Sequence, residues 1–226
     1  KNNKEIQCRI YLDSNVNLFN ITLSDANFNK DIFSNSLSMQ NCGNGEGAKD
    51  CKFQIQGAGW DTSKGNLSVL EAWGYPKYQT KQDSEISHKV QPYSENGIAV
   101  LSSCIQENNI YVTLQAVMDA KTESLDAVAE KLEEENRSLI CRYQKEKDIF
   151  FEQHKKSWAS YWEKADVTVP NERLQQAYDA EMYKIFSNER ENGLPVTLQG
   201  IWNNDLRMPA WCGDWHNDMN VQACYW

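Results

Sequence analysis

The sequence predicts a two-part fold, in which an antiparallel β-sandwich is followed by helices. Residues 1–118 contain short runs rich in Val, Ile, Phe, Tyr and Thr, separated by turn clusters such as SDANFNKD, NCGNGEG and SENG. Near residue 120 the apolar period changes from two to about 3.6 residues, as expected where strands give way to helices. No internal repeat interrupts this order within the 226 residues.

Five runs in the first part are predicted to form strands. They are IQCRIYL, NLFNITL, CKFQIQG, GIAVLSSCI and NIYVTLQAVM. Short strands at this spacing are typical of an antiparallel sandwich. Lys52–Gln56 alternates polar and apolar side chains, as expected where one face of a sheet meets water.

Helical periodicity begins near residue 125 and continues toward Ala165. The residues with this spacing are Leu125, Val128, Ala129, Leu132, Leu139, Tyr143, Phe150, His154, Trp158 and Tyr161, all apolar or aromatic apart from His154. The pattern fits either one long helix or two helices with a break near Asn136. The pair Val169-Pro170 ends it, since the residue before a proline disfavours helical geometry.

A further helix is predicted from Glu172 to Asn192, with Gly193 as its stop signal. Its expected buried stripe consists of Leu174, Ala177, Tyr178, Met182, Ile185 and Phe186. The segment after Pro195 is irregular and rich in tryptophan.

The charge balance excludes two classes of partner. A net charge of -9 argues against nucleic-acid and anionic-membrane binding, both of which need a basic surface. Much of the acidic charge lies in EKLEEE, residues 130–135, which we expect to form a solvated helix face. No apolar run approaches the ~18–20 residues that span a bilayer, so no membrane span is expected. Because the chain lacks an initiator Met and a signal peptide, we interpret it as a portion of a longer protein.

The cysteines and the N-glycosylation sequons indicate in which cellular compartment the protein works. Cys42 and Cys51 bracket the Gly-rich run NCGNGEGAKDC and are a candidate disulfide, with two ordinary thiols as the alternative. No CxxC pair or Cys/His ligand spacing appears, so no zinc site is expected. Sequons occur at Asn20, Asn66 and Asn136. Together these features favour a secreted, periplasmic or lumenal protein.

The last 14 residues, GDWHNDMNVQACYW, alternate polar and apolar side chains. In an extended segment this alternation places Asp214, His216, Asp218, Asn220 and Gln222 on one face. A face of this kind resembles the wall of a polar pocket. The spacing also suggests calcium ligands. However, the sixth and twelfth positions counted from Asp214 are Met and Tyr, where an EF-hand needs Gly and Glu, so no metal site is expected.

Three tryptophans lie in this loop-like region among Asn, Asp, Gly and Pro. Trp202, Trp211 and Trp215 have no helical stripe to account for them. Aromatic rings stack on the apolar faces of sugars while neighbouring polar groups bond the hydroxyls. The composition therefore suits a carbohydrate site.

A long ordered run of identities links this region to a known family. Residues 194–226 read LPVTLQGIWNNDLRMPAWCGDWHNDMNVQACYW and resemble the signature of glycoside hydrolase family 95, the α-L-fucosidase and α-L-galactosidase family. The matching positions are Pro195, Leu198, Gln199, Gly200, Ile201, Trp202, Asn203, Pro209, Trp211, Gly213, Asp214, His216, Asn220, Gln222, Tyr225 and Trp226. Upstream, HKKSWASYWEKADVTVPNERLQQAYDAEMYKIF resembles the linker and first barrel helix of the same family. The resemblance covers about residues 150–226, and the β region fits in order and character only.

The resemblance implies a β-sandwich, a helical linker and then an (α/α)6 barrel that holds the active site. In this chain the ranges would be 1–118 for the sandwich, 119–168 for the linker and 169–226 for the beginning of a truncated barrel. Members of the family hydrolyse with inversion and without a cofactor. A general acid protonates the leaving oxygen while a base activates water, with the two carboxyl groups ~6.5–9.5 Å apart. Both carboxylates lie downstream of the motif, so the resemblance implies that these residues alone do not catalyse.

For this chain the resemblance assigns supporting roles. Asn220 matches an asparagine that positions the nucleophilic water and the base, and Asp218 stands where the family has a second asparagine. An amide donates and accepts at once, whereas an ionised carboxylate only accepts. Either Asp218 joins the base machinery, or the lineage cleaves a different linkage, or it has lost activity. His216 matches a sugar-contacting histidine, and its alternative role is to bond Asp214 and shape the loop.

The expected substrate-binding residues are Trp202, Asn203, Trp211, Asp214 and His216. The expected partners are a glycan with a terminal α-L-fucose or related sugar and the remainder of the barrel. A non-catalytic glycan-binding or assembly module is the alternative, motivated by Asp218 and the unusual cysteines. An inverting phosphorylase would need a phosphate pocket, for which the sequence offers no residues.

Overall fold

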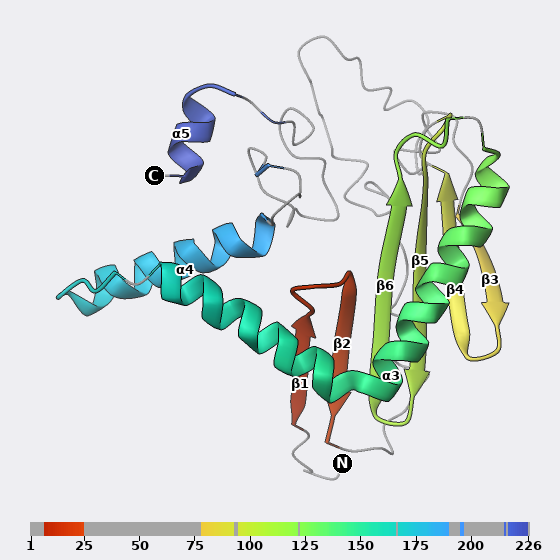
Figure 1. Cartoon of the computed structure of the whole chain (residues 1–226), viewed down its shortest axis with the longest axis horizontal. Helices are drawn as coiled ribbons and strands as arrows, with labels where there is room; N and C mark the ends of the chain where they lie inside the picture. Colours follow the sequence, from red (N-terminus) through yellow and green to blue (C-terminus); the bar gives the residue numbers. More distant parts are fainter. Residues whose placement is uncertain are drawn as a thin grey trace, which may run out of the picture. The chain divides into compact units, whose positions relative to one another are not determined.

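A computed structural model describes residues 7–24, 78–92, 95–121, 123–165, 167–189, 195–196, 215 and 217–225. The described residues divide into two compact units, one up to Trp158 and one from Ala159 onward. The first unit consists of an antiparallel sheet and most of a long helix, and the second is helical (Figure 1). The order of sheet and then helices agrees with the predicted fold class. The predicted domain limits at residues 118 and 168 stay predictions.

Six antiparallel strands form one sheet in the order β1-β2-β6-β5-β4-β3 (Figure 1). Their bounds are Cys8–Leu12 for β1, Leu18–Leu23 for β2, Gln79–Asp83 for β3, Ile86–Pro92 for β4, Ile98–Gln106 for β5 and Asn109–Val117 for β6. Four of the five predicted runs coincide with β1, β2, β5 and β6. The fifth, CKFQIQG, lies outside the described residues, and so does the Cys42–Cys51 loop. All strands of the described residues belong to this one sheet.

Strands β3 and β4 are missing from the sequence-based prediction because their composition is polar. β3 reads QTKQD and its side chains are almost all exposed. It is held by its pairing with β4 and by ion pairs to the following helix, Lys81 with Glu133 at 2.7 Å and Asp83 with Arg137. β4 does alternate between buried and half-buried positions, but one of its buried residues is His88, which does not read as a strand residue.

Helix α3 spans Leu125–Lys164 and covers one face of the sheet (Figure 1). Its contacts with the sheet form two apolar clusters. The first consists of Leu18, Ile86, Cys104, Tyr111, Ile140, Tyr143 and Phe150. The second consists of Val90, Ile98, Val100, Ala120, Val128, Ala129 and Leu132. Burial of these side chains is the main stabilising contribution that α3 makes to the first unit.

A buried polar group, which we call the Asn136 network, belongs to the same helix–sheet interface. Asn136 is 0% exposed, and its Nδ2 donates to the Val100 carbonyl at 3.0 Å and to Ser102 Oγ at 2.8 Å. His88 Nδ1 lies 2.7 Å from the same Ser102 oxygen. The network ties α3 to β4 and β5. The backbone of α3 is helical at Asn136. The kink of the helix lies at Glu146, where φ is -121° and ψ is 22°. The alternative of a break near Asn136 is wrong.

Acid should destabilise the first unit through His88. Burial of its imidazole disfavours the charged form and lowers the pKa of His88 below the ordinary value of 6.5. Below about pH 6.5 the unfolded chain binds a proton that the folded chain does not, so the free energy of unfolding falls with falling pH. The slope approaches about 1.4 kcal/mol per pH unit until the folded pKa is reached. Urea titrations at pH 7.5, 6.5 and 5.5 measure this slope. His88→Gln should remove the part of the slope that is due to the His88 imidazole. An equal slope in both proteins would show that His88 is not its cause.

The turn between β1 and β2 is fastened to α3 by a buried carboxylate. Asp13 is 0% exposed, and its Oδ1 accepts from the amides of Asn15 at 2.8 Å and Val16 at 3.3 Å. Its Oδ2 accepts from the Tyr143 hydroxyl at 3.2 Å, and that hydroxyl lies 2.5 Å from the Tyr11 hydroxyl. These bonds fix the turn against the helix.

Further along α3, His154 and Ser157 contact the same turn. The Ser14 amide donates to His154 Nδ1 at 3.0 Å, and the Ser157 hydroxyl donates to Asn15 Oδ1 at 2.8 Å. The Tyr11 ring packs against the His154 ring, with centroids 5.0 Å apart. The kinked continuation of α3 thus stays on the sheet beyond Glu146.

In the second unit, α4 spans Glu172–Asn188. Asn171 caps it, because its Oδ1 accepts from the amides of Arg173 at 3.0 Å and Leu174 at 3.2 Å. The end of α3 contacts α4 through Tyr161, whose ring stacks on Phe186 at 4.1 Å and whose hydroxyl donates to the Met182 carbonyl at 2.8 Å.

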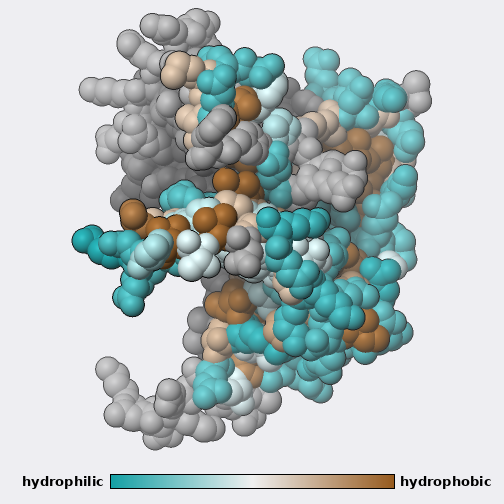
Figure 2. Space-filling view, turned by 60° about the vertical axis from the view of Figure 1, so that its left-hand side comes forward, coloured by the Kyte–Doolittle hydropathy of each residue, from teal (hydrophilic) through white to brown (hydrophobic). Residues whose placement is uncertain are grey.

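The predicted burial and length of α4 are wrong. None of its residues is buried, and Leu174 is 60% exposed. Figure 2 shows hydrophobic residues among hydrophilic ones on one face of the molecule. The described contacts, from Tyr161 to Phe186 and from Tyr178 to Ala165, cover only part of the predicted stripe. The helix also ends at Asn188, because Glu189 is extended with φ -125° and ψ 139°.

Candidate functional site

The predicted catalytic-segment residues lie at a short helix, α5, Met219–Tyr225. Asp218 immediately precedes this helix, and Asn220 lies in its first turn. The five expected substrate-binding residues, Trp202, Asn203, Trp211, Asp214 and His216, lie outside the described part of the chain. Their roles, and those of Asp218 and Asn220, stay predictions.

Local geometry gives Asp218 a structural role as well. The Val221 amide donates to the Asp218 carbonyl at 3.2 Å, which closes the first turn of α5. Aspartate is favoured directly before a helix, where its negative charge complements the partial positive charge of the helix N-terminus. The departure from the family's asparagine is therefore compatible with the fold of this segment.

The extended conformation expected for the terminal segment is wrong for residues 219–225. Residues 219–225 are helical, so the two-residue repeat of an extended segment does not apply to them. Asp218 has Val221 and Gln222 as its neighbours three and four positions on. The alternation of polar and apolar residues indicated an extended segment. It spans too few positions to distinguish a strand from two turns of helix.

Most described side chains of this segment are exposed, and Val221 is half-buried. Trp215 is 45% exposed, Met219 is 79% exposed, and Asp218 is exposed as well. They are not used in packing a core of the described residues. An accessible aromatic ring close in sequence to a carboxylate and an amide has the composition of a sugar-contacting wall.

Among the described residues, no group of three or more His, Cys, Asp or Glu side chains is placed to hold a metal ion. Within the same residues, no helix combines the length and the apolar character needed to cross a membrane.

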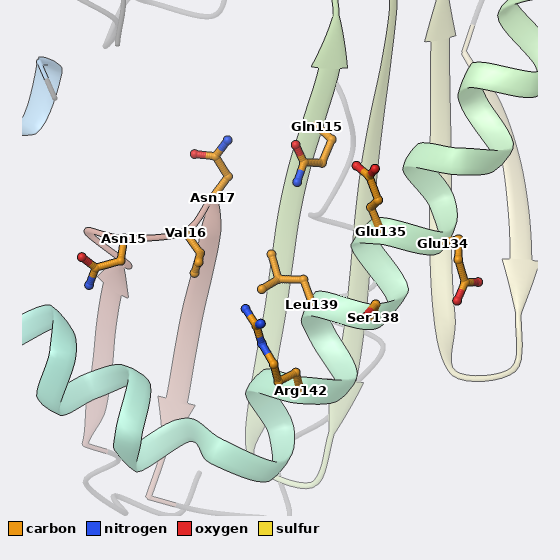
Figure 3. A pocket seen from close by; sticks show the side chains of 9 residues that line it. All are labelled: Asn15, Val16, Asn17, Gln115, Glu134, Glu135, Ser138, Leu139 and Arg142. Carbon is orange, nitrogen blue, oxygen red and sulfur yellow. The ribbon is translucent and has the colours of Figure 1, made fainter. Parts of the chain in front are cut away.

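A polar pocket of about 690 Å³ lies on the first unit (Figure 3). We call it the turn–helix pocket, because it lies between the β1–β2 turn, β6 and α3. Its lining consists of Asn15, Val16, Asn17, Gln115, Glu134, Glu135, Ser138, Leu139 and Arg142. The sequence-based reasoning missed it and described EKLEEE only as a solvated face. Two carboxylates of that run, Glu134 and Glu135, line the pocket. Its lining comes from three distant stretches of chain, so no local motif signals it.

Comparisons with known proteins converge on one family. The model of the glycosyl hydrolase family 95 catalytic domain matches residues 113–226. A protein named probable alpha-fucosidase A from Aspergillus niger is 35% identical over 68 residues, which are 30% of this chain and 8% of that protein. One with the same name from Aspergillus oryzae is 37% identical over 49 residues, 22% of this chain and 7% of that protein. The aligned parts thus span under a tenth of these relatives. No solved structure matches the chain.

Proposed function

Since this chain belongs to glycosyl hydrolase family 95, we propose that it is part of an enzyme that hydrolyses glycans with a terminal α-L-fucose or a related sugar. The observation that carries the proposal is the match of the family's catalytic domain to residues 113–226, which include the terminal segment with its tryptophans and amides. Two matched relatives are themselves named as probable alpha-fucosidases.

The proposed chemistry is hydrolysis with inversion. One carboxylic acid protonates the leaving oxygen, and a carboxylate on the opposite side activates a water. In this proposal neither group lies in residues 1–226, and the chain supplies groups that hold the water and the sugar. Asn220 suits the water site, because its amide donates to a carboxylate and accepts from a water at the same time. Asp218 accepts only, so it bonds a water proton or a sugar hydroxyl. His216 and the loop tryptophans contact the sugar.

The activity is tested on the full-length protein and on residues 1–226 in parallel. Full-length protein is expected to release 4-nitrophenol from 4-nitrophenyl α-L-fucoside with inverted product, which NMR of the first-formed anomer identifies. Residues 1–226 alone are expected to give no turnover, because the acid and base are elsewhere. Turnover by residues 1–226 would contradict the assignment of the chemistry to other residues. Full-length protein that binds fucosylated oligosaccharides without cleaving them would instead support the glycan-binding alternative.

Asp218→Asn in the full-length protein tests the role of the unusual carboxylate. If Asp218 adapts the site to its linkage, the ratio of kcat/KM for α-L-fucoside to that for α-L-galactoside should change at least tenfold, which is about 1.4 kcal/mol. Glu181→Gln is the matched control, an exposed acid on α4 whose partner is Lys184. An unchanged ratio, with both rates as in the wild type, would contradict a role of Asp218 in substrate selection. Its remaining role would then be the structural one at the start of α5.

We also propose that the protein works outside the cytosol. The support is the Cys42–Cys51 pair in its Gly-rich loop, and non-reducing mass spectrometry of the secreted protein tests for that disulfide. The three sequons support this location less than the sequence alone suggested. Asn20 and Asn136 are buried, so neither is a glycan acceptor in the folded protein.

A further inference from the structure

The turn–helix pocket is built by three elements that the first unit holds in place. The β1–β2 turn contributes Asn15, Val16 and Asn17, and β6 contributes Gln115. The lining residues from α3 are Glu134, Glu135, Ser138, Leu139 and Arg142. In Figure 3 the Leu139 side chain and the Arg142 guanidinium point from α3 toward the space beside the turn, and the Gln115 amide lies across from them. A volume of about 690 Å³ falls within the ~300–1,000 Å³ common for small-molecule sites.

The wall formed by the turn is organised before any ligand binds. The Ser157 hydroxyl holds Asn15 Oδ1 at 2.8 Å, and the Thr113 hydroxyl holds the Asn17 carbonyl at 2.6 Å. The buried Asp13 carboxylate holds the amides inside the turn. Val16 and Leu139 pack against the first apolar cluster. A wall fixed in this way loses little conformational entropy on binding, which favours affinity.

Several polar groups of the pocket remain available to a ligand. Within the described residues, no hydrogen bond or ion pair occupies the side chains of Gln115, Glu135 or Ser138. Glu134 is engaged by Arg137 at 2.7 Å. The pocket therefore offers an amide, a carboxylate and a hydroxyl beside the Arg142 guanidinium, together with an apolar floor of Val16 and Leu139.

The charges of the pocket select the class of ligand. Since Glu134 is paired with Arg137, the charges that face a ligand are the Glu135 carboxylate and the Arg142 guanidinium, which together favour a ligand without net charge. A hydroxyl group both donates and accepts, so adjacent hydroxyls match an amide, a carboxylate and a guanidinium together. The apolar floor suits the C–H face of a ring. These properties fit a neutral ring with several hydroxyl groups.

We propose that the turn–helix pocket is a binding site for a neutral saccharide unit, held by Gln115, Glu135 and Arg142 over Val16 and Leu139. The choice of a saccharide among neutral polyols rests on the proposed function, whereas the neutral, polyhydroxylated character follows from the lining. Nothing in the family signature of residues 194–226 contributes to this site. The pocket thus gives the sheet-and-helix unit a recognition role of its own.

Titration of residues 1–226 with L-fucose, D-galactose and lactose, followed by 15N NMR, tests the site. We expect at least one of these sugars to shift the amide signals of residues 15–17, 115 and 135–142. Gln115→Ala and Glu135→Gln should each weaken that binding at least fivefold. Gln106→Ala on β5 and Glu152→Gln on α3 are the matched controls outside the pocket and should leave it unchanged. Thermal unfolding by circular dichroism checks that each variant is folded.

Three outcomes would overturn the inference. They are the absence of pocket shifts up to high millimolar sugar, equal affinity in pocket and control variants, and shifts produced only by phosphate or Ca²⁺ added in place of sugar. Hydrolysis by the full-length protein without sugar binding at the pocket refutes this inference alone. Sugar binding at the pocket without hydrolysis by the full-length protein refutes the proposed function alone.

Discussion

Tyr143→Ala should lower the free energy of unfolding by about 3–5 kcal/mol, the cost typical of removing a large buried aromatic side chain. Tyr143 is 0% exposed, stacks on Phe150 with centroids 4.4 Å apart, and meets the edge of Tyr111 at 6.1 Å. Burial is the main cause that raises the pKa of Tyr143, so its hydroxyl stays protonated and donates to Asp13. The substitution therefore leaves a cavity and also deprives a buried carboxylate of a donor.

Urea denaturation at pH 7.5 measures this change, with hydrogen exchange of the β5 and β6 amides as the readout specific to the first unit. Tyr143→Phe keeps the ring and should cost only about 1.5–3 kcal/mol, the contribution typical of one hydrogen bond to a charged group. Ile149→Ala is the matched control, since this apolar residue lies on the same helix but is 56% exposed. A Tyr143→Ala protein as stable as the Ile149→Ala protein would show that the ring cluster does not support the helix–sheet interface.

Asn136→Asp should be similarly damaging, at about 3 kcal/mol or more at neutral pH. The substitution replaces the amide that donates to Val100 and Ser102 with a carboxylate at a position that is 0% exposed. A carboxylate cannot donate to the Val100 carbonyl, and burying its charge without a cation is costly. The expected loss is smaller below pH 5, because a protonated carboxyl recovers one donor.

The same denaturation experiment, run at pH 7.5 and pH 5.0, tests the Asn136→Asp prediction. Asn96→Asp introduces the same charge at an exposed position of the first unit and should change the free energy of unfolding by less than about 0.5 kcal/mol. Equal effects of the two substitutions would mean that water reaches the Asn136 network. Asn136→Leu separates the two causes, since it removes the hydrogen bonds without adding a charge.

The parts of the fold that could be predicted from the sequence are those with a long, regular apolar pattern. β5, β6 and α3 were predictable because alternation or helical spacing extends over many residues there, so pattern and structure agree. β3 gave no such signal, because its stability comes from pairing with β4 and from ion pairs with residues that follow some 50 positions later. The kink at Glu146 and the exposed stripe of α4 depend on tertiary packing, which a local pattern does not contain.

Of the two candidate sites, one could be predicted from the sequence and the other could not. The family signature identifies the terminal segment by identities in order, and α5 places Asp218 and Asn220 at the start of a helix that the period-two pattern did not indicate. The turn–helix pocket was unpredictable for a different reason. Gln115 and Glu135 meet the β1–β2 turn only because β6 pairs with β2 and α3 returns over the sheet.

The long separation between the β1–β2 turn and its partners has a consequence for folding during synthesis. β2 pairs with β6, with Leu18 opposite Thr113, and the turn bonds to His154 and Ser157 on α3. β1 and β2 pair with each other, but they gain their partners on β6 and α3 only after most of the first unit has been synthesised. Contacts so distant in sequence form slowly, since a large loop must close before they stabilise anything. Until then, the edge of β2 that pairs with β6 in the folded unit is unpaired, and unpaired strand edges make a folding chain prone to aggregation.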